Sequence, residues 1–298
     1  LIVPVVLEQL EKPPTIYPET LKKFIKERAK TKHFSAKTSS HLSSYLQGKD
    51  LDTRVLLVGA GAMKDFRGKE ARELGGKLGK IVQQMRETSV TLLLTAELAE
   101  YAGELVQGWK MVQYDVGLQK TAKSKKKTFY HTEKMLIVSL ADQKLLKMEV
   151  EDAMCIAEAV HFVRDLVNQP ANIINSEYLA AVARKVAKEN GLKKIILGRK
   201  ELQKIGAGGI LAVNQGCDRD PKLLVLQYDG AKNKKEKPLV IIGKGVIFDT
   251  GGYNLKGSGG IETMHQDMAG CATVLGVMNT IKKLGIRKNV VMVAPVVE

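Results

Sequence analysis

Short apolar runs alternate with amphipathic stretches along the first half of the chain. Apolar runs that predict strands buried on both faces lie at Arg54–Val58, Val90–Thr95 and Lys134–Leu140. In Gly68–Thr88, apolar residues recur every three or four positions, which predicts an amphipathic helix, and Ala96–Trp109 predicts another. Strands separated by helices predict an α/β domain whose sheet is mainly parallel and has helices packed on its faces.

The pattern changes near Met148–Asp152, and we expect a domain boundary there. The first domain would span residues 1–150 and the second 151–298. The second begins with a long amphipathic helix, Glu151–Val167, whose apolar residues form one stripe. This helix is predicted to end before Pro170, because proline cannot continue a helix.

One further capped helix and four strands are predicted in the second half. Ser176 is a favourable N-cap for a helix that runs to Asn190, and Gly191 is placed to end it. The predicted strands are Lys194–Leu197, Leu223–Tyr228, Leu239–Ile242 and Val290–Val293. The sequence contains no internal repeat.

The formal net charge of +15 over 298 residues raises the question of nucleic-acid binding. The basic residues are widely spread, however, and cluster locally only at Lys123–Lys127 and Lys232–Lys237. Aromatic residues make up 5% of the chain and do not interleave with these clusters, so no surface for base stacking is predicted. Nucleic-acid binding is therefore the weaker interpretation, and a basic organellar protein explains the charge about as well.

The cysteines and the apolar runs bear on the cellular setting. Cys155, Cys217 and Cys271 are scattered and form no CxxC pair, which predicts reduced, buried thiols in an intracellular protein. No apolar run approaches the roughly 18–20 residues needed to cross a bilayer, so no membrane span is predicted. The run Leu1–Leu7 lacks the basic region of a signal peptide, and we expect a trimmed or processed start. We expect a cytoplasmic protein, with the mitochondrial matrix as the alternative.

A short glycine motif, Gly59-Ala-Gly61, follows the first of these strands. A dinucleotide-binding fingerprint would need a third small residue where Lys64 stands, so that function is not predicted. We expect a tight strand-to-helix turn instead.

Two lysines and two acids are concentrated in a glycine-rich stretch between the last two predicted strands. Lys244 and Asp249 follow a strand that ends at Gly243, and Lys256 and Asp267 come shortly after. Ligands of open α/β sheets bind at the carboxyl ends of strands. Carboxylates can ligate zinc, manganese or magnesium, and a lysine can do so only as a neutral amine of depressed pKa. A second, charged lysine could stabilise a developing oxyanion. From spacing alone, a metal site and a merely solvated loop both remain open.

Longer sequence blocks here resemble the leucyl (cytosol) aminopeptidase family. Residues 243–256, Gly-Lys-Gly-Val-Ile-Phe-Asp-Thr-Gly-Gly-Tyr-Asn-Leu-Lys, are similar to the family's first metal-binding signature, and 267–272 to its next block. Residues 164–170 and 205–216 resemble upstream parts of its catalytic region, and the N-terminal half is similar to its accessory domain. The resemblance implies an α/β protein with an accessory N-terminal domain. Its C-terminal catalytic domain would contain a mixed, mostly parallel sheet flanked by helices.

The resemblance also implies an activity and a role for each residue of the motif. The protein would be a metalloaminopeptidase that removes apolar, leucine-like N-terminal residues from peptides with a water activated by two divalent metal ions. Zinc or manganese is expected, with magnesium or cobalt as alternatives. Lys244 would ligate one metal through its neutral amine, Asp249 would bridge both metals, and Asp267 would be a further ligand of the Lys244 metal. Lys256 would stay charged and polarise the scissile carbonyl, and Met264 would line the pocket for the substrate's first side chain.

The sequence departs from the family after its last predicted strand. A later block, Asn-Thr-Asp-Ala-Glu-Gly-Arg, which supplies the family's remaining metal ligands and an arginine, is absent. The apolar segment Val290–Val297 would leave an unfinished sheet edge, so we expect the catalytic domain to be C-terminally incomplete and the chain to be part of a longer protein. With Lys244, Asp249 and Asp267 alone, two metals cannot both be well held. These 298 residues are therefore predicted to be inactive by themselves.

The assembly and two competing functions complete the expectations. The family forms hexamers, and the resemblance implies a homo-oligomer here. One competitor is a catalytically inactive scaffold or interaction protein that has kept the fold. The other is a nucleic-acid-binding protein that uses the excess positive charge.

Overall fold

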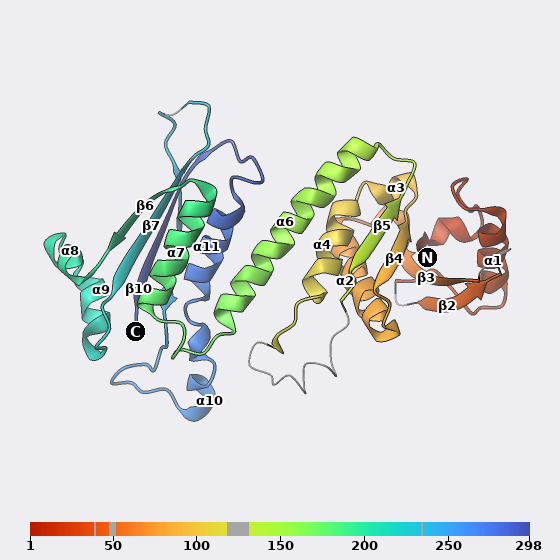
Figure 1. Cartoon of the computed structure of the whole chain (residues 1–298). Helices are drawn as coiled ribbons and strands as arrows, with labels where there is room; N and C mark the ends of the chain where they lie inside the picture. The colour runs from red at the N-terminus through yellow and green to blue at the C-terminus, as the bar shows by residue number, and fades with distance from the viewer. Residues whose placement is uncertain (39, 48–51, 118–130, 234) are drawn as a thin grey trace. The chain divides into compact units, whose positions relative to one another are not determined.

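A computed structural model describes residues 1–38, 40–47, 52–117, 131–233 and 235–298 (Figure 1). The lysine cluster at 123–127 lies outside the described residues. The chain divides into two compact units, Leu1–Ala157 and Glu158–Glu298, and each is described by itself. Among the helices of the described residues, none is long and apolar enough to cross a membrane.

A five-stranded sheet forms the centre of the first unit, with strand order β2-β3-β1-β4-β5. The antiparallel pair β2–β3 lies at one edge, and β3–β1, β1–β4 and β4–β5 are parallel. The mainly parallel sheet expected from the sequence is thus confirmed. The strands are β1 (Ile2–Val6), β2 (His41–Leu46), β3 (Thr53–Gly61), β4 (Ser89–Leu93) and β5 (Lys134–Val138).

Helices cover both faces of this sheet and bury a core on each. The helix α1 (Glu19–Lys30) packs Leu21, Phe24 and Ile25 on one face. The helices α2 (Gly68–Met85) and α4 (Ala102–Val112) belong to the core on the other face. The helix predicted over residues 96–109 is in fact two helices, α3 (Ala96–Ala99) and α4, because the chain turns at residues 100–101.

The motif Gly59-Ala-Gly61 lies within β3, so the turn predicted there is wrong. A side chain at Gly59 would place its Cβ only 2.0 Å from the carbonyl oxygen of Lys37. The glycine is therefore required by a neighbouring segment that approaches the strand, and not by a turn.

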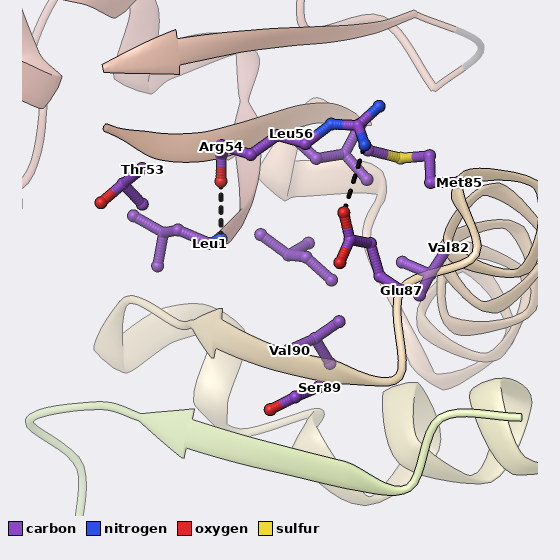
Figure 2. A pocket seen from close by; sticks show the side chains of 10 residues that line it. Leu1, Thr53, Arg54, Leu56, Val82, Met85, Glu87, Ser89 and Val90 are labelled. Carbon is purple, nitrogen blue, oxygen red and sulfur yellow. Dashed lines mark hydrogen bonds and ion pairs between the residues drawn. The ribbon is translucent and has the colours of Figure 1, made fainter. Parts of the chain in front are cut away.

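The amino ends of the three parallel strands β1, β3 and β4 enclose a small pocket of about 170 Å³ (Figure 2). Its polar side is an ion pair between Arg54 Nη1 and Glu87 Oε1, 3.2 Å apart. Both side chains are more than one-third exposed, so this pair contributes little to stability.

One long helix, α6 (Gln143–Val167), begins at Gln143 and not near Glu151 as predicted. The change of pattern near 148–152 therefore lies inside a helix. The first turns of α6 could not be recognised from the sequence, because residues 143–150 carry apolar side chains on more than one face of the helix. Two of these side chains, Leu145 and Met148, are exposed.

A second, mixed sheet forms the centre of the second unit, with order β6-β7-β10-β8 and β9 also paired with β10. A mixed sheet flanked by helices is confirmed. In this sheet β10 pairs in parallel with β8 and β9, whereas the pairs β6–β7 and β7–β10 are antiparallel. The sheet is therefore mixed, but parallel pairs do not predominate in it as expected. The strands are β6 (Lys193–Leu197), β7 (Lys222–Asp229), β8 (Leu239–Ile242), β9 (Gly245–Val246) and β10 (Asn289–Val297).

The last strand is longer than predicted and lies inside the sheet. The segment Val290–Val297 was expected to leave an unfinished edge, but β10 pairs with β7 on one side and with β8 and β9 on the other. One face of β10 is buried in the core of the second unit through Val290, Met292, Ala294 and Val296, whereas Val291, Val293 and Pro295 on the other face are only partly buried.

The helices α7 (Ser176–Asn190) and α11 (Ala269–Thr280) pack on each other and on this sheet (Figure 1). The cap of α7 is Asn175 and not Ser176, because the Asn175 carboxamide oxygen accepts the N–H of Tyr178 at 2.9 Å. Gly191 ends the helix at φ 65°, as predicted. The remaining short helices are α8 (Arg199–Lys204), α9 (Gly208–Val213), η4 (Asn214–Gly216), α10 (Ser258–Ile261) and η5 (Met264–Gln266). In the first unit they are η1 (Leu7–Leu10) and η2 (Met63–Asp65).

Candidate active site

Two glycines allow the end of β8 to cross the start of α11 at very short range, and a third lets β9 lie close to β10. A Cβ at Gly243 would lie 2.5 Å from the carbonyl oxygen of Gly270, and one at Gly270 would lie 2.8 Å from the backbone nitrogen of Lys244. A Cβ at Gly245 would lie 2.6 Å from the carbonyl oxygen of Pro295. Only glycine permits such backbone approaches. At this crossing the N–H of Cys271 donates to the carbonyl oxygen of Lys244 at 2.7 Å.

An interruption in the parallel ladder separates β8 from β9 at this same point. Ile242 is paired with Val293 and Gly245 with Val296, so the gap falls opposite Ala294 and Pro295. Proline has no N–H to donate, and a strand interior tolerates it where pairing is irregular. The break in the ladder places Lys244 between two strands and beside the start of α11.

The Lys244 side chain meets Asp267, which lies just before α11. The Lys244 ammonium is 2.7 Å from Asp267 Oδ2. Its direction does not satisfy the angles of a hydrogen bond, so this buried oxygen has an ion-pair contact but no hydrogen bond. A buried carboxylate oxygen without a hydrogen bond is uncommon, and it is what a cation-binding position requires.

Asp249 and Lys256 form a second ion pair across the glycine-rich loop. Lys256 Nζ lies 2.6 Å from Asp249 Oδ2 and donates to the backbone oxygen of Asp249 at 3.2 Å. The other carboxylate oxygen accepts the N–H of Gly251 at 2.9 Å. Gly251 and Gly252 have φ values of 91° and 66°, which are accessible to glycine and allow the chain to turn back.

The two ion pairs interact electrostatically. The pKa of Asp249 is held below its usual range, first by the hydrogen bond from Lys256 and then by the N–H of Gly251. The charge of Lys244 lowers this pKa further. The structure therefore brings Lys244, Asp249, Lys256 and Asp267 into one electrostatic cluster.

A cavity of about 1210 Å³ opens beside Asp249. One wall comes from the glycine-rich loop and includes Phe248 and Tyr253, and the facing wall is the segment 212–218. Sequence reasoning did not identify this second wall, since it lies more than 30 residues before Asp249 and carries no charged motif of its own.

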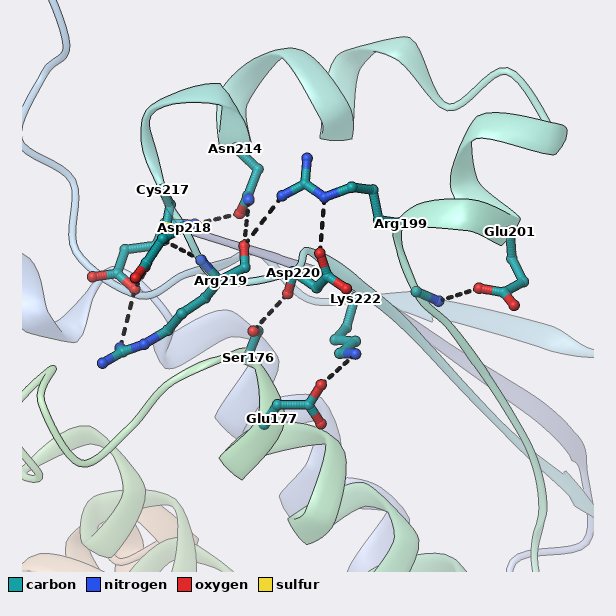
Figure 3. A network of polar contacts seen from close by, with 12 residues as sticks. Ser176, Glu177, Arg199, Glu201, Asn214, Cys217, Asp218, Arg219, Asp220 and Lys222 are labelled. Carbon is teal, nitrogen blue, oxygen red and sulfur yellow. Dashed lines mark hydrogen bonds and ion pairs between the residues drawn. The ribbon is translucent and has the colours of Figure 1, made fainter.

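Asn214 fixes that second wall (Figure 3). Its side chain is 1% exposed, donates to the carbonyl oxygen of Arg219 at 2.7 Å, and accepts the N–H of Glu298 at 3.2 Å. Asp220 ties the same turn to two helices, because its carboxylate pairs with Arg199 at 2.8 Å and its carbonyl accepts the Ser176 hydroxyl at 2.7 Å. A buried asparagine with both ends of its amide bonded holds this wall against the end of β10.

Sequence comparisons identify the family of this chain. Residues 161–298 match the profile "Cytosol aminopeptidase family, catalytic domain", and residues 2–123 match "Cytosol aminopeptidase family, N-terminal domain". The chain belongs to the cytosol aminopeptidase family. The resemblance found in the sequence is thus confirmed.

Similar proteins and structures agree with this family. A probable cytosol aminopeptidase of Cupriavidus metallidurans is 36% identical over 82% of this chain and 50% of its own length. A probable cytosol aminopeptidase of Geobacter is 31% identical over 91% of this chain and 55% of its own length. The chain thus spans about half the length of these curated relatives. The fold resembles that of the bottromycin maturation enzyme BotP in complex with Mn, with a TM-score of 0.77 and 22% identity over 100% of this chain and 59% of that one.

The residues present fit a metal of this family in part. Asp249 and Asp267 offer carboxylate oxygens and Lys244 offers an amine, and Oδ2 of Asp267 is in contact with the Lys244 ammonium but accepts no hydrogen bond. Across the described residues, however, no group of three or more histidine, cysteine, aspartate or glutamate side chains could hold a metal ion. The donor set therefore suits one cation better than two.

Met264 and Cys271 are the remaining side chains of the motif. Met264 is half-buried in η5, and its carbonyl oxygen accepts the N–H of Asp267 at 3.3 Å. It does not line the cavity beside Asp249. Cys271 is fully buried, and burial raises the pKa of its thiol to about 12, so it is no nucleophile near neutral pH.

Proposed function

We propose that this chain carries the first part of a metalloaminopeptidase active site that hydrolyses apolar, leucine-like N-terminal residues from peptides. The observation that supports this function is the cluster in which Lys244 meets Asp267 at 2.7 Å and Lys256 meets Asp249 at 2.6 Å. By the family resemblance of the sequence, these four positions correspond to functional positions of the family's motif. Membership of the cytosol aminopeptidase family supports the same activity.

Lys244, Asp249 and Asp267 are the residues that would hold the metal. Zinc or manganese suits the donor set, with magnesium or cobalt as alternatives, and BotP is a neighbouring structure in complex with Mn. Two bound divalent ions would supply an activated water and positions for the substrate's amine and carbonyl. Asp249 would contribute an ionised carboxylate to the metal site, since the hydrogen bonds from Lys256 and Gly251 hold its pKa below the usual range.

Lys256 would act on the substrate through its positive charge. Its ammonium is kept in place by the carboxylate and the carbonyl oxygen of Asp249. A fixed ammonium beside the reacting carbonyl stabilises the negative charge that develops on the carbonyl oxygen during hydrolysis. Losing one such donor costs about a hundredfold to a thousandfold in kcat.

The substrate and the assembly follow from the same proposal. The thioether of Met264 is suited to an apolar side chain at the substrate's N-terminus. Val246 and Phe248 give the cavity beside Asp249 an apolar part that suits peptide side chains. A homo-oligomer, a hexamer by the family resemblance, is proposed for the whole protein.

The 298 residues are proposed to be inactive by themselves. Two divalent ions need more ligands than one amine and two carboxylates, because even a four-coordinate zinc takes three protein ligands in catalytic sites. The described residues bring no third acid to the cluster. Activity is therefore expected only when the rest of a family catalytic domain is present.

A chimaera tests the function directly. These 298 residues would replace the matched half of the Cupriavidus metallidurans relative, and the unmodified relative would be the positive control. We expect metal-dependent hydrolysis of leucine p-nitroanilide by the chimaera. We also expect Lys256→Ala to lower its kcat about a hundredfold or more, because the oxyanion loses its charged partner.

Two outcomes would contradict the proposal. A folded, metal-loaded chimaera that hydrolyses no aminoacyl anilide would show that this half does not support the chemistry. A Lys256→Ala chimaera with unchanged kcat would show that Lys256 has no part in it.

A further inference from the structure

The first unit contains a second cavity, remote in sequence from the motif of the active site. It measures about 460 Å³ and is lined by residues that follow the carboxyl ends of three parallel strands. Gln9 follows β1, Thr95 follows β4 and Leu140 follows β5. Ligands of open parallel sheets bind at these ends of the strands, and the volume is within the usual range for a small-molecule site.

The orientation of the Gln9 carboxamide in this cavity is fixed by its neighbours. Gln9 is 4% exposed, and its carboxamide oxygen accepts the N–H of Val6 at 3.2 Å and the hydroxyl of Tyr17 at 3.3 Å. A backbone N–H can only donate, so the carboxamide atom that faces Val6 must be the oxygen. The NH₂ group of Gln9 is therefore the end that meets Thr95, with 3.4 Å between Gln9 Nε2 and the Thr95 hydroxyl oxygen.

Two hydrogen-bond donors are left over at this place. Thr95 is 5% exposed, and its hydroxyl oxygen accepts one hydrogen of Gln9 Nε2. Among the described residues, no acceptor is found for the second hydrogen of Gln9 Nε2 or for the Thr95 hydroxyl proton. Both side chains line the cavity. Because buried polar groups are nearly always hydrogen-bonded, an acceptor inside the cavity is what would complete these two donors.

The charges around the cavity decide which kind of acceptor fits. Glu8, Glu97 and Lys12 belong to its lining, and all three are exposed. A carboxylate or phosphate ligand would face two carboxylates and one ammonium, so an anionic acceptor is disfavoured. An ammonium or amidinium group has no lone pair with which to accept a hydrogen bond, so a cation leaves both donors unused. A neutral carbonyl oxygen has two lone pairs and can accept from Gln9 and Thr95 together.

Much of the remaining lining is apolar. Pro13, Pro14 and Ile16 come from the segment before α1, and Leu140 comes from the segment after β5. Leu140 is 73% exposed although it lines the cavity. An aliphatic group in the cavity would cover this side chain and remove its surface from water.

We propose that this cavity binds a neutral carboxamide that carries a short aliphatic body, the chemistry of a peptide group beside an apolar side chain. The amide carbonyl oxygen accepts hydrogen bonds from Gln9 Nε2 and from the Thr95 hydroxyl. The aliphatic body packs against Ile16 and Leu140, and the amide N–H is left to solvent or to the carboxylate of Glu97. This inference does not depend on the proposed peptidase function, because the cavity shares no residue with the active-site cluster.

Three probes of nearly the same shape test the site in the full 298-residue chain at pH 7. The first, 3-methylbutanamide, carries the neutral carboxamide. In 3-methylbutanoate an oxygen replaces the NH₂ group and makes the probe an anion, and in 3-methylbutanamidinium an NH₂ group replaces the carbonyl oxygen and makes it a cation. In nuclear magnetic resonance titrations we expect the amide to bind at least about tenfold more tightly than either ion, which corresponds to about 1.4 kcal/mol. The shifts should centre on the side-chain amide signals of Gln9 and the backbone amide of Thr95.

Substitutions at Thr95 separate its hydroxyl group from the shape of the site. Thr95→Val removes the donor at nearly the same volume, and we expect it to lower the affinity for 3-methylbutanamide about tenfold. Thr95→Ser keeps the hydroxyl and should keep the affinity within about twofold. Thr91→Val is the matched control, because Thr91 lies on β4 and does not line the cavity, and it should leave the affinity unchanged.

Several outcomes would overturn the proposal. One is binding of either ion as tight as that of the amide. Another is an affinity for the amide that Thr95→Val leaves unchanged, or that Thr91→Val lowers equally. Shifts confined to residues 158–298, or the absence of any shift on addition of the amide, would overturn it as well.

Discussion

The position of Lys244 depends on two glycines, Gly243 and Gly270, because neither carries a side chain. Gly243 and Gly270 allow two backbones to approach within a distance that a Cβ would forbid. The ammonium of Lys244 then reaches Asp267 across the start of a helix. The motif Gly-Lys-Gly is thus a steric requirement as much as a chemical one, because the glycines set the position and the lysine supplies the functional group.

The sequence could predict the charged residues of the site but not what positions them. Lys244, Asp249 and Asp267 are charged and close in sequence, so the motif identifies them directly as candidates. Asn214 could not be recognised from the sequence, because its structural role depends on hydrogen bonds to the backbone of Arg219 and Glu298. Only the fold brings these partners together.

The buried thiol of Cys271 leads to a prediction about how labelling and stability depend on pH. Its pKa is raised by burial from 9.0 to about 12, so the native thiolate fraction at pH 8 is roughly a thousandfold below that of an unfolded thiol. We expect a thiol reagent to label Cys271 only after unfolding, by mass spectrometry of digested protein. The unfolded state releases this proton first, so the free energy of unfolding falls as pH rises from about 9 and levels off above about 12.

The control for this prediction is Cys271→Ala. Other groups also titrate at high pH, so the relevant quantity is the difference between the two proteins. That difference should shrink as pH rises through this window. Equal labelling rates at Cys271 in native and unfolded protein would show that the thiol is not buried.

At the scale of elements, β10 organises the second unit. It receives β7 antiparallel on one side and β8 and β9 parallel on the other. The apolar pattern predicted a strand here, and periodicity could not tell whether it was interior or at an edge. Strand direction depends on which segments pair, and pairing is decided by contacts between residues that are distant in sequence. The antiparallel β6–β7–β10 arrangement could therefore not be predicted from the apolar pattern.

Pro295 is expected to maintain the gap between β8 and β9. In Pro295→Ala, the new N–H can donate to the β8–β9 segment and extend the ladder across the gap, which draws Lys244 away from Asp267. We expect manganese affinity, measured by calorimetry, to fall about tenfold, while the free energy of unfolding changes by only about 1 kcal/mol, the usual value of one hydrogen bond.

Pro238→Ala is the matched control. Pro238 is exposed and directly precedes β8, so its replacement leaves the gap intact. Equal manganese affinities in the Pro295→Ala and Pro238→Ala proteins would argue against a positioning role for Pro295.

At the scale of the whole molecule, each unit has its own core and its own match to one domain of the cytosol aminopeptidase family. The alternation of strands and helices was sufficient to predict an α/β chain of this kind. The excess of basic residues was not informative about the fold. Each ion pair found among the described residues involves at least one side chain that is more than one-third exposed, and such pairs contribute at most about 1 kcal/mol each.

Metal binding by this chain is the most direct test of its central feature, the cluster of Lys244, Asp249 and Asp267. Calorimetric titration with Mn²⁺ should give one ion per chain, because one amine and two carboxylates suit a single cation. Asp249→Asn and Asp267→Asn should each abolish binding, whereas Asp218→Asn, in the facing wall of the cavity, should leave it unchanged. Binding that survives both active-site substitutions, or that the Asp218 variant loses equally, would contradict the assignment of these residues as metal ligands.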